Sequence, residues 1–132
     1  MKELALFPLS IFLLPGDFAQ LYIFEERYKQ LIADCVEHNI NFGIPYTHKL
    51  NAANIGCEVE VAEIVKRYPG GELDILIKGV DIFQLDKFMY QSENKLHPAG
   101  RVTELHAREK PASEQLILKF KEYLQRYNPE QV

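Results

Sequence analysis

Two runs of alternating side chains, joined by a tight turn, constrain the fold of this chain more than any other feature. The first run, 55–68, alternates apolar residues with Glu58 and Glu60, and the second, 72–80, alternates leucine and isoleucine with charged residues. A period of two is typical of strands that turn one face to a core. The sequence Pro69-Gly70-Gly71 between the runs is a strong turn signal. The pattern predicts an antiparallel hairpin with Glu58 and Glu60 on a solvated face, and a bulge near 62–65, where the alternation slips.

Shorter apolar runs on both sides of this hairpin predict further strands. We expect residues 4–17 to form a strand, a bend and a turn, because Pro8 and Pro15 interrupt the apolar run. Strands are also expected at 18–24, 42–46, 80–90 and 96–105, with Gly79 separating 72–80 from 80–90. Both faces of 18–24 carry apolar residues, which indicates burial. The domain should therefore be mainly β.

One segment changes to a helical period. Six residues fall on one face of a helix over 25–38 and are expected in the core: Phe24, Tyr28, Leu31, Ile32, Cys35 and Val36. Glu25 and Glu26 stand in the first turn, where carboxylates favour the positive end of the helix dipole. Asn39 is a plausible end, since Asn tolerates the left-handed conformation that closes many helices.

The composition indicates one cytoplasmic domain. A length of 132 residues with 47% hydrophobic residues suffices for one core. The net charge of -4 argues against nucleic acid as a partner. Cys35 and Cys57 lie in apolar stretches and are expected to be buried thiols in a reducing compartment. No stretch reaches the roughly 18 apolar residues of a membrane helix, and prolines interrupt the signal-like start.

The last 24 residues, 109–132, differ from the rest. Ser113 is a good helix start, and an apolar stripe follows it as far as Tyr127. This helix either docks back on the β domain or belongs to a helical region that continues beyond the chain. We therefore expect two units, 1–108 and 109–132.

Two blocks of motifs carry a family resemblance. Leu6-Phe7-Pro8-Leu9, Leu14-Pro15-Gly16 and Ile23 to Tyr28 resemble the opening of the amino-terminal domain of the Lon ATP-dependent protease. The second block runs from Ile55-Gly56 through the glycine turn to Phe83. It departs from the family pattern at Ile82, where the family usually has arginine.

The resemblance implies a PUA-like, six-stranded pseudobarrel with one packed helix, followed by a carboxy-terminal helix, as in stand-alone bacterial members. It also implies a non-catalytic module that binds unfolded or partly folded polypeptide, as an adaptor or regulator that works with a protease or chaperone. The chain has no phosphate-loop motif for an ATPase. Some PUA-like barrels bind RNA, and RNA binding is the alternative function.

Two groups of residues are candidate sites. Ile11, Phe12 and Leu13 cannot all point into one core, so this segment is a candidate peptide-binding patch. Glu25, Arg27 and Tyr28 lie at a strand-to-helix junction, where we expect one charged residue to cap the helix and the other to pair with a carboxylate.

We assign no catalytic or metal-binding role to the remaining polar residues. The four histidines, His38, His48, His97 and His106, lack metal-ligand spacing and are expected on the surface or in loops. Glu58, Glu60 and Glu63 are interpreted as solvated or edge-protecting residues. We expect no catalytic residue, metal or cofactor.

Overall fold

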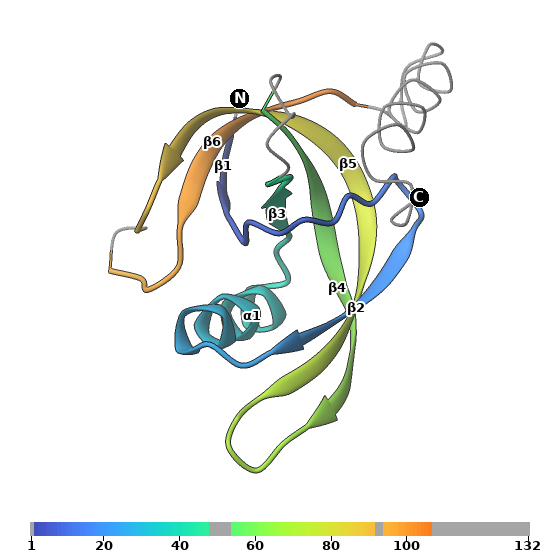
Figure 1. The fold of residues 1–132 in the computed structure, drawn as a ribbon, viewed down its shortest axis with the longest axis vertical. Coiled ribbons are helices and arrows are strands. Elements are labelled where there is room, and N and C mark those ends of the chain that lie inside the picture. The colour runs from blue at the N-terminus through green and yellow to red at the C-terminus, as the bar shows by residue number, and fades with distance from the viewer. Residues whose placement is uncertain (1, 48–53, 92–93, 107–132) are drawn as a thin grey trace.

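The computed structural model describes residues 2–47, 54–91 and 94–106 and contains six strands and one helix in that part of the chain (Figure 1). The elements in chain order are β1 (Lys2–Ala5), β2 (Phe18–Ile23), α1 (Glu26–His38), β3 (Phe42–Pro45), β4 (Ile55–Arg67), β5 (Leu73–Met89) and β6 (Ala99–Glu104). All strand pairs are antiparallel. The predicted mainly β domain with one helix is confirmed.

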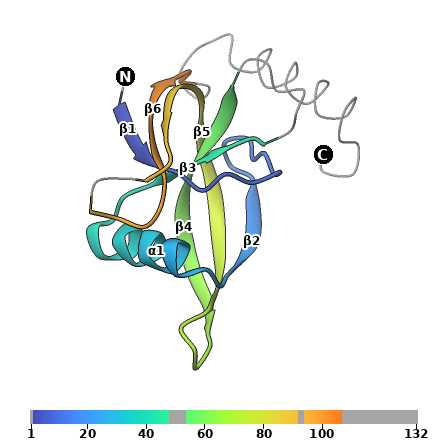
Figure 2. The ribbon, with the colours of Figure 1, turned by 60° about the vertical axis from the view of Figure 1, so that its left-hand side comes forward.

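The sheet curls until its two ends meet. Its order is β1-β6-β5-β4-β3, and β2 pairs with the first half of β5 beside this path. Isolated parallel bridges from Leu6 to Gly43 and from Leu9 to Tyr46 connect the chain after β1 with β3. The Phe7 N–H donates to the Gly43 carbonyl oxygen at 2.8 Å across this closure. The curved sheet encloses the core (Figure 2), and its PUA-like classification stays a prediction.

β4 and β5 form the antiparallel hairpin expected from the alternating runs, and it extends past the rest of the sheet (Figure 1). Its register shifts between Val61 and Glu63 and again between Ile64 and Lys66, so the expected irregularity near 62–65 is confirmed. A bulge leaves one residue unpaired and increases the local twist. The hairpin can therefore twist away from the closed part of the sheet.

β5 is longer than the sequence predicts. It runs from Leu73 to Met89 through Gly79 without interruption, so the expected separation into two strands is wrong. Gly79 is buried, and a Cβ added there would collide with the carbonyl oxygen of Leu14. This glycine marks a close approach of two backbones and not the end of a strand.

α1 closes one side of the core. Tyr28, Leu31, Ile32 and Cys35 are buried, and Asn39 ends the helix with a φ of 51°, both as expected. Phe24 and Val36 are exposed, so their predicted place in the core is wrong. The sequence period alone does not show how wide a stripe of the helix the sheet covers, and here the covered stripe is narrower than the apolar one.

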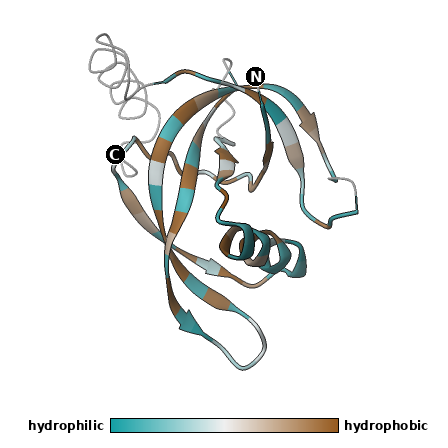
Figure 3. Cartoon of the chain, turned by 180° about the vertical axis from the view of Figure 1, so that it is seen from behind, coloured by the Kyte–Doolittle hydropathy of each residue, from teal (hydrophilic) through white to brown (hydrophobic). Residues whose placement is uncertain are grey.

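Hydrophobic and hydrophilic residues alternate along the long strands (Figure 3). The largest fully buried side chains include Phe42 and Phe83. Ile82, which stands where the resembled family usually has arginine, is also fully buried and packs with Leu14. The predicted helix at 109–132 lies outside the described residues, and the boundary proposed at 108 lies there too. No helix in the described ranges is long and apolar enough to cross a membrane.

Candidate functional site: an exposed aromatic ridge

Exposed aromatic side chains gather on the outer face of β2 and on the hairpin beside it. Phe18, Tyr22 and Phe24 are 55%, 53% and 59% exposed. Tyr68, next to the hairpin turn, is half-buried and lies against Tyr22. We call Phe18, Tyr22, Phe24 and Tyr68 the aromatic ridge. The prediction that both faces of 18–24 are buried is therefore wrong.

Strand geometry produces this exposure. Successive side chains of a strand point to opposite faces, so Ala19, Leu21 and Ile23 pack into the core while Phe18 and Tyr22 point away from it. The sequence signal for the site is that both faces of 18–24 are apolar, because a strand covered on one face alone leaves half of its apolar residues exposed. It could not show that the outer face of β2 lacks a covering element among the described residues.

Three of the four ridge residues are linked by ring contacts through Tyr22. The rings of Tyr22 and Phe24 are stacked with centroids 5.7 Å apart, and those of Tyr22 and Tyr68 meet edge to face, also at 5.7 Å. Both arrangements are favourable for aromatic pairs. The ridge is thus partly organised before any partner binds, which lowers the entropy lost on binding.

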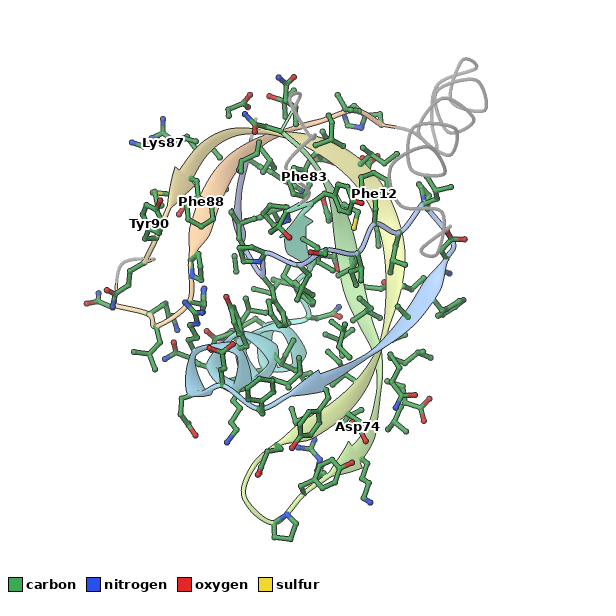
Figure 4. All side chains as sticks on the ribbon, viewed as in Figure 1. Phe12, Asp74, Phe83, Lys87, Phe88 and Tyr90 are labelled. Atoms are coloured by element: carbon green, nitrogen blue, oxygen red, sulfur yellow. The ribbon has the colours of Figure 1, made fainter. Side chains whose placement is uncertain are left out.

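The hairpin turn holds Tyr68 in place. The Tyr68 hydroxyl donates to Asp74 Oδ2 at 2.6 Å, and Asp74 marks this end of the hairpin in Figure 4. This hydrogen bond raises the pKa of the Tyr68 hydroxyl. Gly71 supplies the positive φ of 93° that the turn needs, and Lys29 Nζ donates to the Gly70 carbonyl oxygen at 3.2 Å. Helix α1 therefore anchors the turn next to the ridge.

Two lysines lie over the aromatic faces. Lys66 Nζ is 4.7 Å from the centroid of Tyr68, and Lys78 Nζ is 5.7 Å from that of Phe18. Such cation–π contacts contribute about 0.5–1 kcal/mol at exposed sites. The surface is therefore aromatic with a cationic margin.

The candidate patch at 11–13 lies elsewhere and is largely covered. Leu13 is buried in the main core, and Ile11 and Phe12 are half-buried. The Phe12 ring meets Tyr46 edge to face at 5.9 Å. The three residues do not form an exposed patch, so the expectation of one is wrong. Peptide binding by this segment stays a prediction. Ile11 and Phe12 are the two residues of the segment that could contact a peptide without unfolding of the core.

The strand-to-helix junction shows the expected pairing with a carboxylate but not the expected side-chain cap. Arg27 Nη2 pairs with Glu25 Oε1 at 3.3 Å, and both side chains are nearly half exposed. Glu25 makes no side-chain cap hydrogen bond, so its predicted capping role is wrong. Tyr28 is buried and stacks on Phe7 with centroids 3.8 Å apart, while the Arg27 guanidinium lies 4.7 Å from the Tyr28 centroid. The junction adjoins the ridge at Phe24, and its structural role stays a prediction.

An ionic cluster around the buried Glu58 occupies another part of the sheet. Lys2 Nζ lies 2.9 Å from Glu58 Oε1 and 3.0 Å from Glu104 Oε1, and Asn41 Nδ2 donates to Glu58 Oε2 at 2.8 Å. Glu58 is buried, so its predicted place on a solvated face is wrong, whereas Glu60 is half-buried and Glu63 exposed. The reason is tertiary: Lys2 reaches Glu58 from β1, which is distant in sequence.

The cysteines and histidines differ in how far they are buried. Cys35 and Cys57 are buried free thiols, as expected, and burial raises the pKa of each to about 12. His97 lies in the loop before β6, as expected, but it is buried there, with Nδ1 2.9 Å from the Pro98 carbonyl oxygen. His38 is exposed and His106 half-exposed.

In the described ranges, two groups of side chains bring potential metal-ligating atoms within 4.8 Å of one another, one at Asp34, Glu37 and His38 and one at Asp81, Glu104 and His106. Salt bridges from Lys95 to Asp34 and from Lys2 to Glu104 already engage a carboxylate of each.

Comparison with known proteins places the chain among Lon amino-terminal domains. A structure titled as a Lon N-terminal domain protein from Xanthomonas campestris aligns with a TM-score of 0.68 at 26% identity, covering 94% of this chain and 74% of that one. The N-terminal domain of the Mycobacterium avium complex Lon protease shares the fold, with a TM-score of 0.61 at 16% identity over 97% of this chain and 70% of that one. No curated protein matches.

The family model for the ATP-dependent protease La (LON) substrate-binding domain matches residues 3–131, nearly the whole chain, and no ATPase or protease domain is detected beside it. The expected resemblance is confirmed, and the chain belongs to the LON substrate-binding domain family.

Proposed function

We propose that this chain is a non-catalytic module that binds unfolded or partly folded polypeptide through the aromatic ridge. The observation that carries the proposal is the exposure of Phe18, Tyr22 and Phe24, each more than half accessible, on a preorganised surface. Exposed apolar patches mark partner surfaces, and tyrosine is enriched among residues that dominate binding. Membership of a substrate-binding family supports a polypeptide as the partner.

A module of this kind would work as an adaptor or regulator of proteolysis, holding a substrate for a protease or chaperone. Unfolded chains expose the apolar side chains that folded proteins bury, so an aromatic surface selects for them without reading a particular sequence. The ridge is a better candidate than Ile11 and Phe12, because its side chains are accessible without any rearrangement. RNA binding finds little support, since the net charge is -4.

The test compares binding of an unfolded and a folded protein. Fluorescence anisotropy would follow the binding of reduced, carboxamidomethylated α-lactalbumin, with native α-lactalbumin as the folded competitor. We expect Tyr22→Ser to weaken binding of the unfolded form by about tenfold, the effect of losing one dominant tyrosine.

Tyr90→Ser is the matched control. Tyr90 is 86% exposed but lies at the far end of β5, away from Asp74 and the ridge (Figure 4). Equal losses in the two variants, or binding of folded and unfolded protein with the same affinity, would refute the ridge as the binding surface. Salt-sensitive binding of mixed RNA without binding of unfolded protein would favour the RNA alternative.

A further inference from the structure

One edge of β2 carries no strand in the part of the chain that the structure describes. β2 pairs with β5 on one side, along Phe18 to Ile23, and has no second partner among the described residues. Natural edge strands usually carry charges or proline, which discourage pairing with another chain. The residues from Phe18 to Phe24 include neither. Within the described ranges, this edge is therefore unprotected.

Hydrogen bonds at the start of β2 determine which backbone groups face that edge. The Gly16 N–H donates to the Gly79 oxygen at 2.9 Å, and the Gly79 N–H donates to the Asp17 oxygen at 2.8 Å. In an antiparallel ladder, alternate residues exchange hydrogen bonds with the partner strand. The register that follows from Phe18↔Lys78 turns the backbone groups of Ala19, Leu21 and Ile23 toward β5. The N–H and C=O groups of Phe18, Gln20 and Tyr22 consequently face the open edge.

The same three residues present their side chains on the outer face, and all three are exposed. A strand added at this edge would satisfy their backbone groups and place alternate side chains beside Phe18 and Tyr22. Cross-strand contacts between aromatic and β-branched residues stabilise such pairs. Backbone affinity and side-chain selection would thus act on the same segment, as in other cases of strand addition.

We propose that the edge of β2 binds an extended polypeptide segment as an added strand, with uncharged apolar residues at alternate positions. This inference rests on the proposed function and names its binding mode. A second copy of the chain is a poorer occupant. In a symmetric antiparallel pairing of two β2 strands with the two-fold axis at Leu21, Asp17 of one copy would lie opposite Glu25 of the other at both ends, and like charges directly opposite are destabilising.

The test removes one edge-facing N–H without removing a bond to β5. Proline has no N–H and is tolerated in an edge strand where that group would face solvent. Gln20→Pro should weaken binding of reduced, carboxamidomethylated α-lactalbumin by about tenfold, whereas Gln20→Ser, which keeps the N–H, should stay within about twofold of the unchanged protein. Circular dichroism would verify that both variants are folded.

A second measurement needs no variant. Amide hydrogen exchange of the unchanged protein should slow at Phe18, Gln20 and Tyr22 when the unfolded probe is added. Absence of this protection would overturn strand addition, as would full binding by folded Gln20→Pro. If Tyr22→Ser still lost binding in that case, the ridge would bind through side chains alone and the proposed function would stand. Probe-independent dimerisation, abolished by Gln20→Pro, would show that a second copy occupies the edge and would also overturn the proposal.

Discussion

Among single residues, Glu58 depends most clearly on a distant partner. Its side chain is only 5% exposed, and Lys2 supplies the cation 2.9 Å from Oε1. Lys2→Met would leave this carboxylate buried beside Glu104 without that cation. We expect a loss of about 2 kcal/mol in the free energy of unfolding, between the values for a surface pair and a fully buried one. Urea denaturation would measure it. Glu58→Gln should recover part of the loss in the Lys2→Met background, because Asn41 can still donate to the glutamine oxygen. An unchanged urea midpoint in Lys2→Met would contradict this account.

Among the elements, β5 shows how a single small residue keeps a long strand continuous. It pairs with β4, β2 and β6 along its length, and Gly79 lies where the chain around Leu14 crosses closely. Gly79→Ala would place a methyl group against a backbone oxygen that cannot move independently. We expect a loss of about 2–3 kcal/mol, in the range for overpacking a core. Gly70→Ala is the control, since its new Cβ would meet only the flexible side chain of Glu72. Thermal unfolding would separate the two, and equal melting temperatures would show that Gly79 is not restricted by packing.

For the whole molecule, burial of Cys35 and Cys57 makes stability depend on alkaline pH. Both thiols have a pKa raised to about 12 by burial, whereas an unfolded thiol titrates near about 8.5. Above that pH the unfolded chain loses protons that the folded chain keeps, so the free energy of unfolding falls as pH rises. Burial lowers the pKa of Lys2, but hydrogen bonds to Glu58 and Glu104 raise it by more. The stabilisation linked to this raised pKa is fully present below the ordinary lysine pKa. It is lost as pH rises through the raised value.

The expected result is a stability that declines steadily above about pH 9. Iodoacetamide should modify both cysteines only at the rate at which the protein unfolds. A Cys35→Ala, Cys57→Ala double variant should show a shallower alkaline decline. Rapid modification of either thiol in the folded protein at pH 8 would contradict the burial on which this prediction rests.

Local patterns predicted much of the architecture. The hairpin around Pro69-Gly70-Gly71 and the helix ending at Asn39 depend on turn chemistry and on periods within one segment, and both are present. The motifs at 6–9 and 23–28 also led to the correct family. The sequence alone therefore determined the element types and the family, because those depend on neighbours along the chain.

Assembly in three dimensions determined the candidate site. Tyr22 is exposed and Glu58 is buried because of what lies across from each, which is an open outer face for one and Lys2 for the other. Gly79 continues a strand because the Leu14 backbone passes beside it. Burial and pairing between residues far apart in sequence depend on how the sheet closes, and a one-dimensional pattern holds no information about which face a distant segment will cover.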